Sequence, residues 1–396
     1  MAVSLQAGER RPRRVSILGS TGSVGCNTID LLRRLPGAYA VEALTAHTNV
    51  ELLVAQALEL KPTMAVIGEK SLYGALKEGL AGTNIAVGAG PEALVDAAGL
   101  PADWVMAAIV GAAGLPPTLA AVKRGVTVAL ANKECLVCAG PLMMKEIEQS
   151  GATLLPVDSE HSAIFQVFDF DNVDAVDRVI LTASGGPFLK LDMAAMAKVT
   201  PKQAVAHPNW DMGDKISVDS ATMMNKGLEV IEASYLFPVP EERIEVLIHP
   251  QSVVHSLVAY KDGSVLAQLG VPDMRTPISY ALAWPRRQSS PAARLDLVAV
   301  GALTFEAPDL KRFPALALAR EALKTGQAAP TVLNAANEVA VQGFLAGEIG
   351  FLDIMRVVTE VLEKGPRGAI ASIGDVTGVD AEARRIAGEV VASIRG

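Results

Sequence analysis

VSILGSTGSVG, residues 15–25, joins a short apolar run to three glycines, Gly19, Gly22 and Gly25, and leads into the helix-like segment CNTIDLLRRL, residues 26–35. Between a strand and a helix, glycines let the backbone approach a pyrophosphate held at the N-terminus of the helix. The spacing is G-x-x-G-x-x-G, a variant of G-x-G-x-x-G. A glycine turn alone is equally typical of an ordinary tight turn, but the strand, turn and helix order around it favours dinucleotide binding.

The same alternation continues to about residue 150. Apolar, strand-like runs occupy residues 39–46, 64–68, 104–110 and 126–131, and helix-like segments such as residues 50–60 lie between them. This order is typical of a parallel, doubly wound sheet with helices on both faces. Residues 1–150 are therefore predicted to form a Rossmann-like domain in a protein of the α/β class.

The pattern changes in residues 151–285, which are predicted to form a central α+β domain. Four strand-like runs and a single strong helix are recognisable here, and the strands are expected at residues 177–184, 245–250, 252–260 and 264–270. Lys261-Asp262-Gly263 separates the last two runs, and Asp-Gly is a favoured hairpin dipeptide, so these runs are predicted to pair antiparallel.

Two further segments complete the chain. Residues 286–312 begin with a stretch rich in Pro, Ser and charge and are predicted to be a linker. Residues 313–396 contain four segments with apolar residues at helical spacing, most of which end at glycine, so a carboxy-terminal helical bundle is predicted.

The composition narrows the kinds of partner and the class of protein to be expected. The 396 residues carry a net charge of -8, which argues against a nucleic-acid or anionic-membrane partner, because such surfaces need a concentrated basic footprint. The first 14 residues are basic but contain no apolar stretch, so they are not expected to be a secretory signal. Residues 104–122 are uncharged, but glycines and prolines interrupt them as in a strand, a turn and a helix start. A small-molecule enzyme is the expectation.

The three cysteines, Cys26, Cys135 and Cys138, are too few for a secreted disulfide framework and favour a reducing cytoplasm. Cys135 and Cys138 form an isolated C-x-x-C. Redox or zinc chemistry is one interpretation of this pair, and packed core thiols are the other.

Three carboxylates indicate a metal site. Asp158 and Glu160 lie in PVDSEHSAIFQ, residues 156–166, and Glu229 ends the helix-like run VDSATMMNKGLE, residues 218–229. Oxygen ligands without a matching Cys/His set suit Mg²⁺ or Mn²⁺ better than zinc. In an extended segment, Asp158 and Glu160 would project from one face, and Glu229 would join them from elsewhere. Surface charge or helix capping is the alternative, and His161 is either a support for a metal ligand or a core histidine.

Other polar residues suit a phosphorylated substrate. Ser184 follows a predicted strand, and Ser220, Asn225 and Lys226 lie on or before the helix that is expected to end at Glu229. Hydroxyls, an amide and an ammonium group suit a phosphate monoester, whereas capping and a surface lysine are the alternatives for each residue singly. Lys133 follows another predicted strand, where it could meet a substrate oxygen or remain a solvated loop lysine.

A lid is predicted between these motifs. AVAHPNWDMGDK, residues 204–215, contains His207, Trp210, Met212 and Gly213 without any periodicity, as expected of a segment that closes over a ligand. His249 and His255 are expected to be structural histidines on strands. After the second predicted strand no acid is present to bind a ribose 2′-hydroxyl, and Thr48 and Asn49 could tolerate a 2′-phosphate, which favours NADP over NAD.

These motifs resemble the 1-deoxy-D-xylulose 5-phosphate reductoisomerase family. The resemblance runs through GSTGSVG, ALANKE, PVDSEHSA, TASGGPF, HPNWDMGDKISVDSATMMNKGLE, IHPQSVVHS and VPDMRTPISYALAWP, and it covers nearly the whole chain. It implies rearrangement and NADPH-dependent reduction of 1-deoxy-D-xylulose 5-phosphate to 2-C-methyl-D-erythritol 4-phosphate. This is a step of non-mevalonate isoprenoid biosynthesis. A cytoplasmic homodimer that binds Mg²⁺, Mn²⁺ or Co²⁺ is also implied.

The resemblance also implies roles for individual residues. The implied NADPH contacts are Thr21, Gly22, Ser23, Val24, Asn132, Glu134 and Gly213, with Asn49 beside them. The implied metal ligands are Asp158, Glu160 and Glu229, which together with Lys133 and His207 form the catalytic set. The implied substrate contacts are Lys133, Ser159, Glu160, Ser184, His207, Ser220, Asn225, Lys226 and Glu229, with Trp210 in the flexible flap.

One departure and two alternatives accompany this interpretation. Many family members have Gly-Lys-Asn or Gly-Arg-Asn where this chain has His47-Thr48-Asn49, so a weaker preference for NADPH is expected. The first alternative function is that of a plain NADP-dependent dehydrogenase of a phosphorylated sugar, which would not need three carboxylates. The second is that of a dinucleotide-sensing regulatory protein, which would need no metal. The acidic residues and lysines argue against both alternatives.

Overall fold

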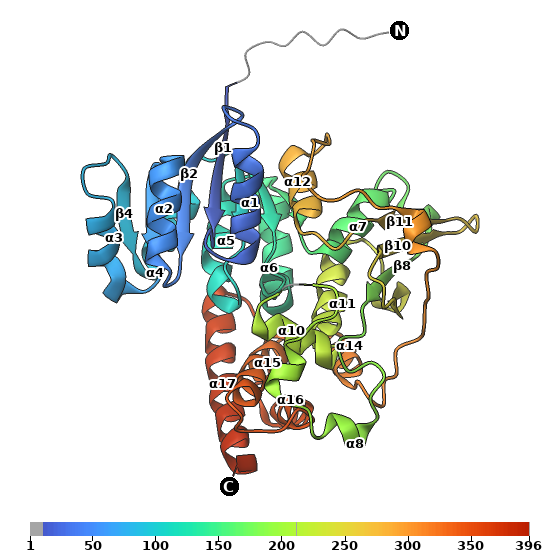
Figure 1. Cartoon of the computed structure of the whole chain (residues 1–396). Coiled ribbons are helices and arrows are strands. Elements are labelled where there is room, and N and C mark those ends of the chain that lie inside the picture. The colour runs from blue at the N-terminus through green and yellow to red at the C-terminus, as the bar shows by residue number, and fades with distance from the viewer. Residues whose placement is uncertain (1–10, 211, 396) are drawn as a thin grey trace, which may run out of the picture.

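The computed structural model describes residues 11–210 and 212–395. Most of the basic amino-terminal segment discussed above, and Asp211 of the predicted lid, lie outside the described residues. Figure 1 shows a sheet-containing amino-terminal part, a second sheet beside it, and helices at the carboxy-terminal end.

The amino-terminal part is a seven-stranded sheet in which every neighbouring pair is parallel, with the order β4-β3-β2-β1-β5-β6-β7. Its strands are β1 (Arg13–Leu18), β2 (Tyr39–Ala46), β3 (Met64–Ile67), β4 (Ala86–Ala89), β5 (Trp104–Ala107), β6 (Thr127–Leu130) and β7 (Thr153–Pro156). The strand order reverses between β1 and β5, and ligands of open α/β sheets bind beyond the carboxyl ends of the strands at such a reversal. β7 extends the sheet past residue 150, where the sequence predicted the domain to end.

Helices cover both faces of this sheet, as the doubly wound prediction requires. They are α1 (Ser23–Arg33), α2 (Val50–Leu60), α3 (Tyr73–Gly79), α4 (Gly90–Gly99), α5 (Leu115–Lys123) and α6 (Glu134–Ser150). The uncharged run at residues 104–122 forms β5, a short 3-10 turn and most of α5, as predicted. Among the described residues, none of the helices combines the length and the apolar character that a membrane crossing requires.

One helix reaches this part from much later in the chain. α12 (Arg275–Ala283) lies beside α1 (Figure 1), and its residues Ile278, Ala281 and Leu282 join the buried core of the parallel sheet. The indole N–H of Trp104 on β5 donates a hydrogen bond to the carbonyl oxygen of Ala281 at 3.1 Å. Local periodicity does not reveal this contact, because its partners are 177 residues apart.

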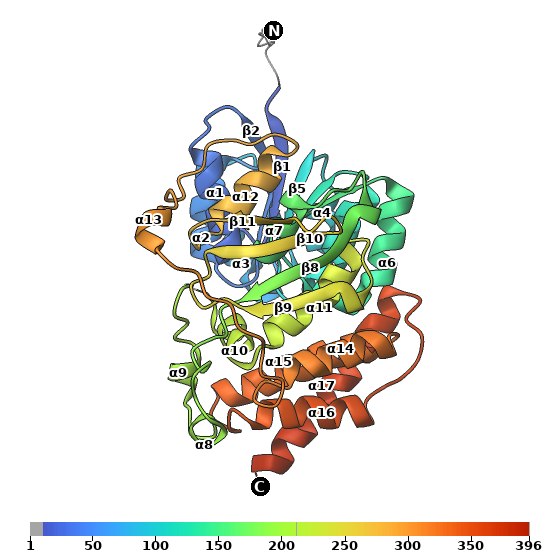
Figure 2. The same ribbon diagram turned by 90° about the vertical axis from the view of Figure 1, so that its right-hand side faces the viewer.

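The second sheet has the order β11-β10-β8-β9 (Figure 2). Its strands are β8 (Val176–Ala183), β9 (Ile244–Ile248), β10 (Val254–Tyr260) and β11 (Val265–Leu269). β10 and β11 pair antiparallel across residues 261–264, which confirms the predicted hairpin. β9 runs parallel to β8, so the sheet is mixed.

The prediction of a single strong helix in residues 151–285 is wrong. Besides α12, the described part of this range contains five α-helices, namely α7 (Ser159–Val167), α8 (Met193–Met196), α9 (Pro201–Ala204), α10 (Asp214–Thr222) and α11 (Met224–Leu236). α8 and α9 have four residues each, too few to show a helical period. The predicted end of α11 at Glu229 is also wrong, because the buried residues Val230, Ile231 and Ala233 carry the helix further.

The carboxy-terminal part is the predicted helical bundle. It consists of α14 (Ala315–Thr325), α15 (Ala329–Leu345), α16 (Asp353–Lys364) and α17 (Ile373–Arg395). Residues 286–312 run along the surface to reach it, with the short α13 (Leu297–Val300) and a bridge between Glu306 and Ile248 on the way (Figure 2). The bundle and the mixed sheet share one hydrophobic core.

Candidate active site

A cavity lies beyond the carboxyl ends of β1, β6, β7 and β8, where the two sheets face each other. It collects most of the side chains that the sequence singled out. The predicted residues that line it are Ser23, Val24, Lys133, Asp158, Ser159, Glu160, Ser184, His207, Trp210, Met212, Gly213, Ser220, Asn225, Lys226 and Glu229.

The three predicted metal ligands converge in this cavity. One oxygen from each of Asp158, Glu160 and Glu229 lies within 4.8 Å of the other two. The predicted extended segment is wrong, because Asp158 is the N-cap residue of α7 and Glu160 belongs to its first turn. The two carboxylates still share one location because both sit at the N-terminus of this helix, where the helix dipole favours negative charge. Glu229 comes from the middle of α11 and is fully buried.

Two buried lysines balance these carboxylates. Lys133 Nζ lies 2.5 Å from Asp158 Oδ2 and 3.3 Å from Glu229 Oε1, and Lys226 Nζ lies 3.0 Å from Glu160 Oε1 and also pairs with Glu229. Burial would lower the pKa of Lys133, but Asp158 and Glu229 outweigh it and raise the pKa well above its usual value. Both ammonium groups therefore carry their charge within the acidic cluster.

The cluster retains an excess of negative charge, because three carboxylates face two ammonium groups. Burial and the neighbouring Asp158 and Glu160 raise the pKa of Glu229, although Lys226 and Lys133 oppose this shift. Asp158 Oδ1 is buried and accepts no hydrogen bond among the described residues. Three convergent carboxylates with an unpartnered oxygen fit a hard divalent cation such as Mg²⁺ or Mn²⁺.

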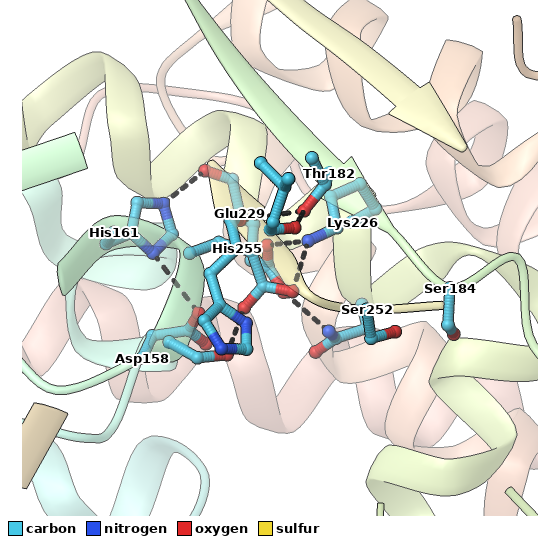
Figure 3. A network of polar contacts seen from close by, with 12 residues as sticks. Asp158, His161, Thr182, Ser184, Lys226, Glu229, Ser252 and His255 are labelled. Carbon is cyan, nitrogen blue, oxygen red and sulfur yellow. Dashed lines mark hydrogen bonds and ion pairs between the residues drawn. The ribbon is translucent and has the colours of Figure 1, made fainter. Parts of the chain in front are cut away.

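His161 and Glu232 are both fully buried. Figure 3 shows His161 beside Asp158. His161 Nδ1 lies 3.1 Å from Glu232 Oε2 and 3.6 Å from Asp158 Oδ1, while Nε2 lies 2.9 Å from the carbonyl oxygen of Glu229. Burial would lower the pKa of His161, but Glu232 and Asp158 raise it to about 9, so the ring is an imidazolium that donates from Nε2 to the carbonyl oxygen of Glu229 and forms ion pairs with the two carboxylates on its Nδ1 side. Glu232 was missed by sequence reasoning, and its i, i+3 spacing from Glu229 was the available signal.

The predicted phosphate-binding residues line the same cavity, with Asn225 and Lys226 in contact with the carboxylate cluster. Gly185 and Gly186 follow Ser184 with φ angles of 83° and 68°, which favour glycine. A Cβ on Gly186 would lie 2.7 Å from the carbonyl oxygen of Ser220, so glycine lets β8 and α10 approach each other here. Asn225 and Lys226 extend the group along α11 towards Glu229.

The flap segment is attached to this group through His207. His207 Nδ1 accepts hydrogen bonds from the backbone N–H groups of Asn209 and Trp210, at 3.2 and 3.0 Å. Nε2 therefore carries the proton and donates to Ser184 Oγ at 2.9 Å. Burial lowers the pKa of His207, which favours this neutral form.

The expectation that His255 is a structural histidine is incomplete. Its side chain lines the cavity with its ring 6.0 Å from that of Trp210, rather than serving only as a structural histidine. Thr182, Ser252 and Met274 line the cavity too and were also missed, because hydroxyl and thioether residues on strands and turns carry no distinctive spacing. His249 is structural as expected: it is buried, donates to the carbonyl oxygen of Thr304, and accepts from two backbone N–H groups.

The glycine turn after β1 packs closely against neighbouring backbone. A Cβ on Gly19 would lie 2.5 Å from the carbonyl oxygen of Ala108, and one on Gly25 would lie 2.2 Å from that of Gly19. Thr21 belongs to this turn and Gly22 is the N-cap residue of α1, whose first residues Ser23 and Val24 line the cavity.

Other predicted cofactor contacts already have protein partners. Asn132 donates hydrogen bonds to the carbonyl oxygens of Ile109 and Gly111, and so shapes the loop after β5. Glu134 pairs with Lys215 at 3.2 Å, and Asn49 Oδ1 caps α2 at 3.1 Å. None of these three side chains lines the cavity itself.

The isolated C-x-x-C pair is packed core. Cys135 and Cys138 are both buried in α6 among apolar side chains. Burial raises the pKa of Cys135 to about 12, so its thiol stays protonated at neutral pH. Low thiolate content makes redox exchange or metal ligation by this pair unfavourable.

Family models match most of the chain in three segments. The model of 1-deoxy-D-xylulose 5-phosphate reductoisomerase matches residues 15–140, and two models described as C-terminal domains of this enzyme match residues 154–237 and 269–386. A 1-deoxy-D-xylulose 5-phosphate reductoisomerase of Rhodospirillum centenum is 63% identical over 384 residues, covering 97% of this chain and 96% of the relative.

The chain belongs to the 1-deoxy-D-xylulose 5-phosphate reductoisomerase family.

Solved structures of reductoisomerases share its fold. The Zymomonas mobilis enzyme in complex with NADPH superposes with a TM-score of 0.91 at 54% identity, covering 96% of this chain and 99% of that one. A DOX-P reductoisomerase in complex with NADPH, fosmidomycin and magnesium superposes with the same TM-score at 43% identity, covering 96% and 98%.

The carboxylate geometry of this reductoisomerase generates a prediction about metal affinity. Glu229→Gln keeps the size of the side chain but removes one anionic ligand, so Mn²⁺ affinity should fall by at least about tenfold. Isothermal titration of Mn²⁺ into the purified variant measures this, with Glu245→Gln, a change of an exposed carboxylate on β9, as control. Equal Mn²⁺ affinity of Glu229→Gln and the unmodified chain would contradict the metal assignment.

The shifted pKa values of the buried His161 and Glu232 predict that the free energy of unfolding depends on pH. The folded-state pKa of His161, about 9, exceeds its ordinary 6.5, so its contribution is fully present below pH 6.5 and is lost as pH rises through 9. Burial raises the pKa of Glu232 to about 7, which acts in the same direction. The metal-free chain should therefore lose on the order of 3 kcal/mol of unfolding free energy from pH 6 to 9.5.

Urea unfolding at several pH values measures this loss. His161→Gln should flatten the dependence above pH 6.5, because the titrating ring is gone. A variant with the same pH slope as the unmodified chain would assign the loss to other groups.

Proposed function

We infer that this chain converts 1-deoxy-D-xylulose 5-phosphate to 2-C-methyl-D-erythritol 4-phosphate, with NADPH and a divalent metal ion. The observation that carries this inference is the convergence of Asp158, Glu160 and Glu229 beside a phosphate-binding group and below a dinucleotide-type glycine turn. The first stage rearranges the ketose phosphate into an isomeric branched aldehyde. The second stage adds hydride and a proton to that aldehyde.

The acidic cluster is proposed to hold the metal through Asp158, Glu160 and Glu229. When bound, a divalent cation supplies Lewis acidity at the substrate's ketone and adjacent hydroxyl oxygens. Lys133 and Lys226 already lie among these carboxylates, so they can shift onto substrate oxygens when a cation takes their place. Their positive charge then stabilises negative charge that develops on oxygen during the rearrangement. His161 and Glu232 keep Asp158 in place from behind.

A second group of residues in this cavity is proposed to hold the substrate phosphate. Ser184 and Ser220 supply hydroxyl groups, Asn225 an amide and Lys226 a positive charge. Neutral His207 donates from Nε2, which in the free chain meets Ser184 Oγ and can turn to a phosphate oxygen. Binding energy from this remote group orients the reacting carbons and favours flap closure by Trp210 over them. Ser159, at the start of α7, is proposed to contact the carbon chain between the metal and the phosphate.

NADPH is proposed to lie along the glycine turn and the start of α1. Backbone N–H groups from Thr21 to Val24 suit the pyrophosphate, and Gly213 at the end of the flap contributes from the other side. Asn132 and Glu134 shape the loops that border this region, and Asn49 lies after β2, where the adenosine ribose of a doubly wound domain binds. NADPH supplies the hydride when it is bound.

The activity assay gives the principal test. With 1-deoxy-D-xylulose 5-phosphate, NADPH oxidation should require Mg²⁺ or Mn²⁺ and should fall by at least about hundredfold in Glu229→Gln at saturating metal. Product identification by NMR separates rearrangement from plain reduction.

NADH should give a lower kcat/KM than NADPH, and equal values would contradict the proposed cofactor preference. A metal-independent reduction to an unbranched alcohol would favour a plain dehydrogenase, and NADPH binding without turnover would favour a sensor.

A cytoplasmic homodimer is proposed as the working form. β11 is an edge strand, and no other described strand pairs with its outer side. Val265, Leu266 and Leu269 on it are 50%, 48% and 37% exposed. An exposed apolar edge strand is a template for pairing with another strand, and a second copy offers the same edge.

Light scattering tests the proposed dimer. Leu266→Asp should shift the chain towards the mass of a monomer, because the charge would be buried at the paired edge. Leu58→Asp is the matched control, since Leu58 on α2 is also 48% exposed but lies far from β11. An unmodified chain that is monomeric, or a Leu266→Asp variant that remains dimeric, would contradict pairing through β11.

A further inference from the structure

α10 lies where three parts of the molecule meet (Figure 1). These are the amino-terminal part with the parallel sheet, the part with the mixed sheet, and the carboxy-terminal helical bundle. α10 begins directly after Gly213 of the flap and carries Ser220 of the proposed phosphate site near its end. Lys215 lies in its first turn and does not line the cavity, so the chemistry described above does not use it. Its contacts nevertheless connect all three parts.

Lys215 joins α10 to the dinucleotide-binding part. Its Nζ lies 3.2 Å from Oε1 of Glu134, the first residue of α6, and 2.9 Å from Oδ2 of Asp219 on α10 itself. The side chains of Glu134 and Asp219 are only 9% and 1% exposed. Buried carboxylates are costly without a compensating charge, and Lys215 compensates both. Glu134 directly follows Lys133, so this ion pair lies at the edge of the acidic cluster.

Asp219 in turn joins α10 to the carboxy-terminal bundle. Asn337 of α15 is fully buried, and its Nδ2 donates to Asp219 Oδ1 at 2.7 Å. The next residue, Glu338, forms an ion pair with Arg384 of α17. The two oxygens of one carboxylate are thus divided between Lys215 and the bundle.

This arrangement fixes the distances between the two binding regions. α10 has nine residues and is short enough to shift as one body, carrying Gly213 and Ser220 with it. Displacement of α10 from the start of α6 would therefore move the flap end and the phosphate anchor relative to Lys133. Misplacement of reacting groups by about 1 Å can reduce a rate by about hundredfold.

We propose that Lys215 is a positioning residue that couples NADPH binding to binding of the substrate phosphate, by holding α10 between Glu134 and the Asp219–Asn337 contact. The proposal rests on the proposed function and deepens it. Lys215 itself touches neither ligand. Its loss changes the affinity for both, because Gly213 directly precedes α10 and Ser220 lies near its end.

Lys215→Met, Lys215→Arg and Arg320→Met provide the test. Arg320 is a matched control, because its side chain is 25% exposed against 26% for Lys215 and pairs with Glu241 away from the cavity. Lys215→Met should raise both the Kd for NADPH, measured by calorimetry without substrate, and the KM for 1-deoxy-D-xylulose 5-phosphate by about tenfold, equivalent to about 1.4 kcal/mol. Lys215→Arg should restore most of both affinities, since a guanidinium can reach both carboxylates.

A structural role alone predicts a different result. Lys215→Met would then lower Tm as Arg320→Met does, while leaving both constants within about twofold of the unmodified values, and this would overturn the proposal. If Lys215→Met does not fold, Lys215→Gln keeps one hydrogen bond and should shift the same two constants by a smaller factor. Unchanged constants in folded Lys215→Gln would also overturn it. Failure of the unmodified chain to turn over substrate would refute the proposed function, whereas the NADPH Kd ratio would still decide the role of Lys215.

Discussion

The balance of charge inside one buried cluster is the constraint on which the rest of this structure depends. Lys133, Lys226 and Glu229 are buried, while Asp158 and Glu160 are partly exposed to the cavity. None of the buried charges could be there alone at an acceptable cost. The fold must therefore bring Lys133, Asp158 and Glu229 together from the ends of β6 and β7 and from the middle of α11. Residues that follow β6 and β7, residues of β8 and β10, and residues of α11 all line the cavity.

The chain meets this constraint by placing reactive residues where regular elements begin or end. Asp158 follows β7 and stands at the N-cap position of α7, Ser184 follows β8, and Lys133 precedes α6. Such positions are held by the backbone hydrogen bonds of their element, but their side chains are free to face a cavity. Glu229 is the exception, since it lies within a helix, and its burial requires the partners on both sides. The imidazolium of His161 contributes to that balance through the carbonyl oxygen of Glu229.

Local sequence signals predicted the parts of the structure that depend on neighbouring residues. The glycine turn, the alternation of strands and helices, the hairpin at Asp262-Gly263 and the carboxy-terminal helices all follow from short-range pattern. The resemblance to a known family supplied most individual site residues. Pattern alone failed where tertiary contacts decide the conformation: the segment at Asp158 is helical instead of extended, and α11 continues past Glu229 because buried apolar residues follow. The position of His255 in the cavity and the ion pair between Lys215 and Glu134 depend on residues far apart in the chain, which no local period encodes.

Because α12 packs on the parallel sheet, the amino-terminal part of this protein is not one contiguous stretch of chain. Ile278, Ala281 and Leu282 complete the core beside β1, and the indole of Trp104 finds its only hydrogen-bond partner among the described residues on that helix. The dinucleotide-binding part is thus a discontinuous unit, assembled from two stretches separated by more than a hundred residues of intervening chain. Recombination between related genes could exchange this unit alone and intact only through three crossovers, one after β7 and one on each side of α12. A single crossover between the two stretches would combine the sheet of one parent with the covering helix of the other.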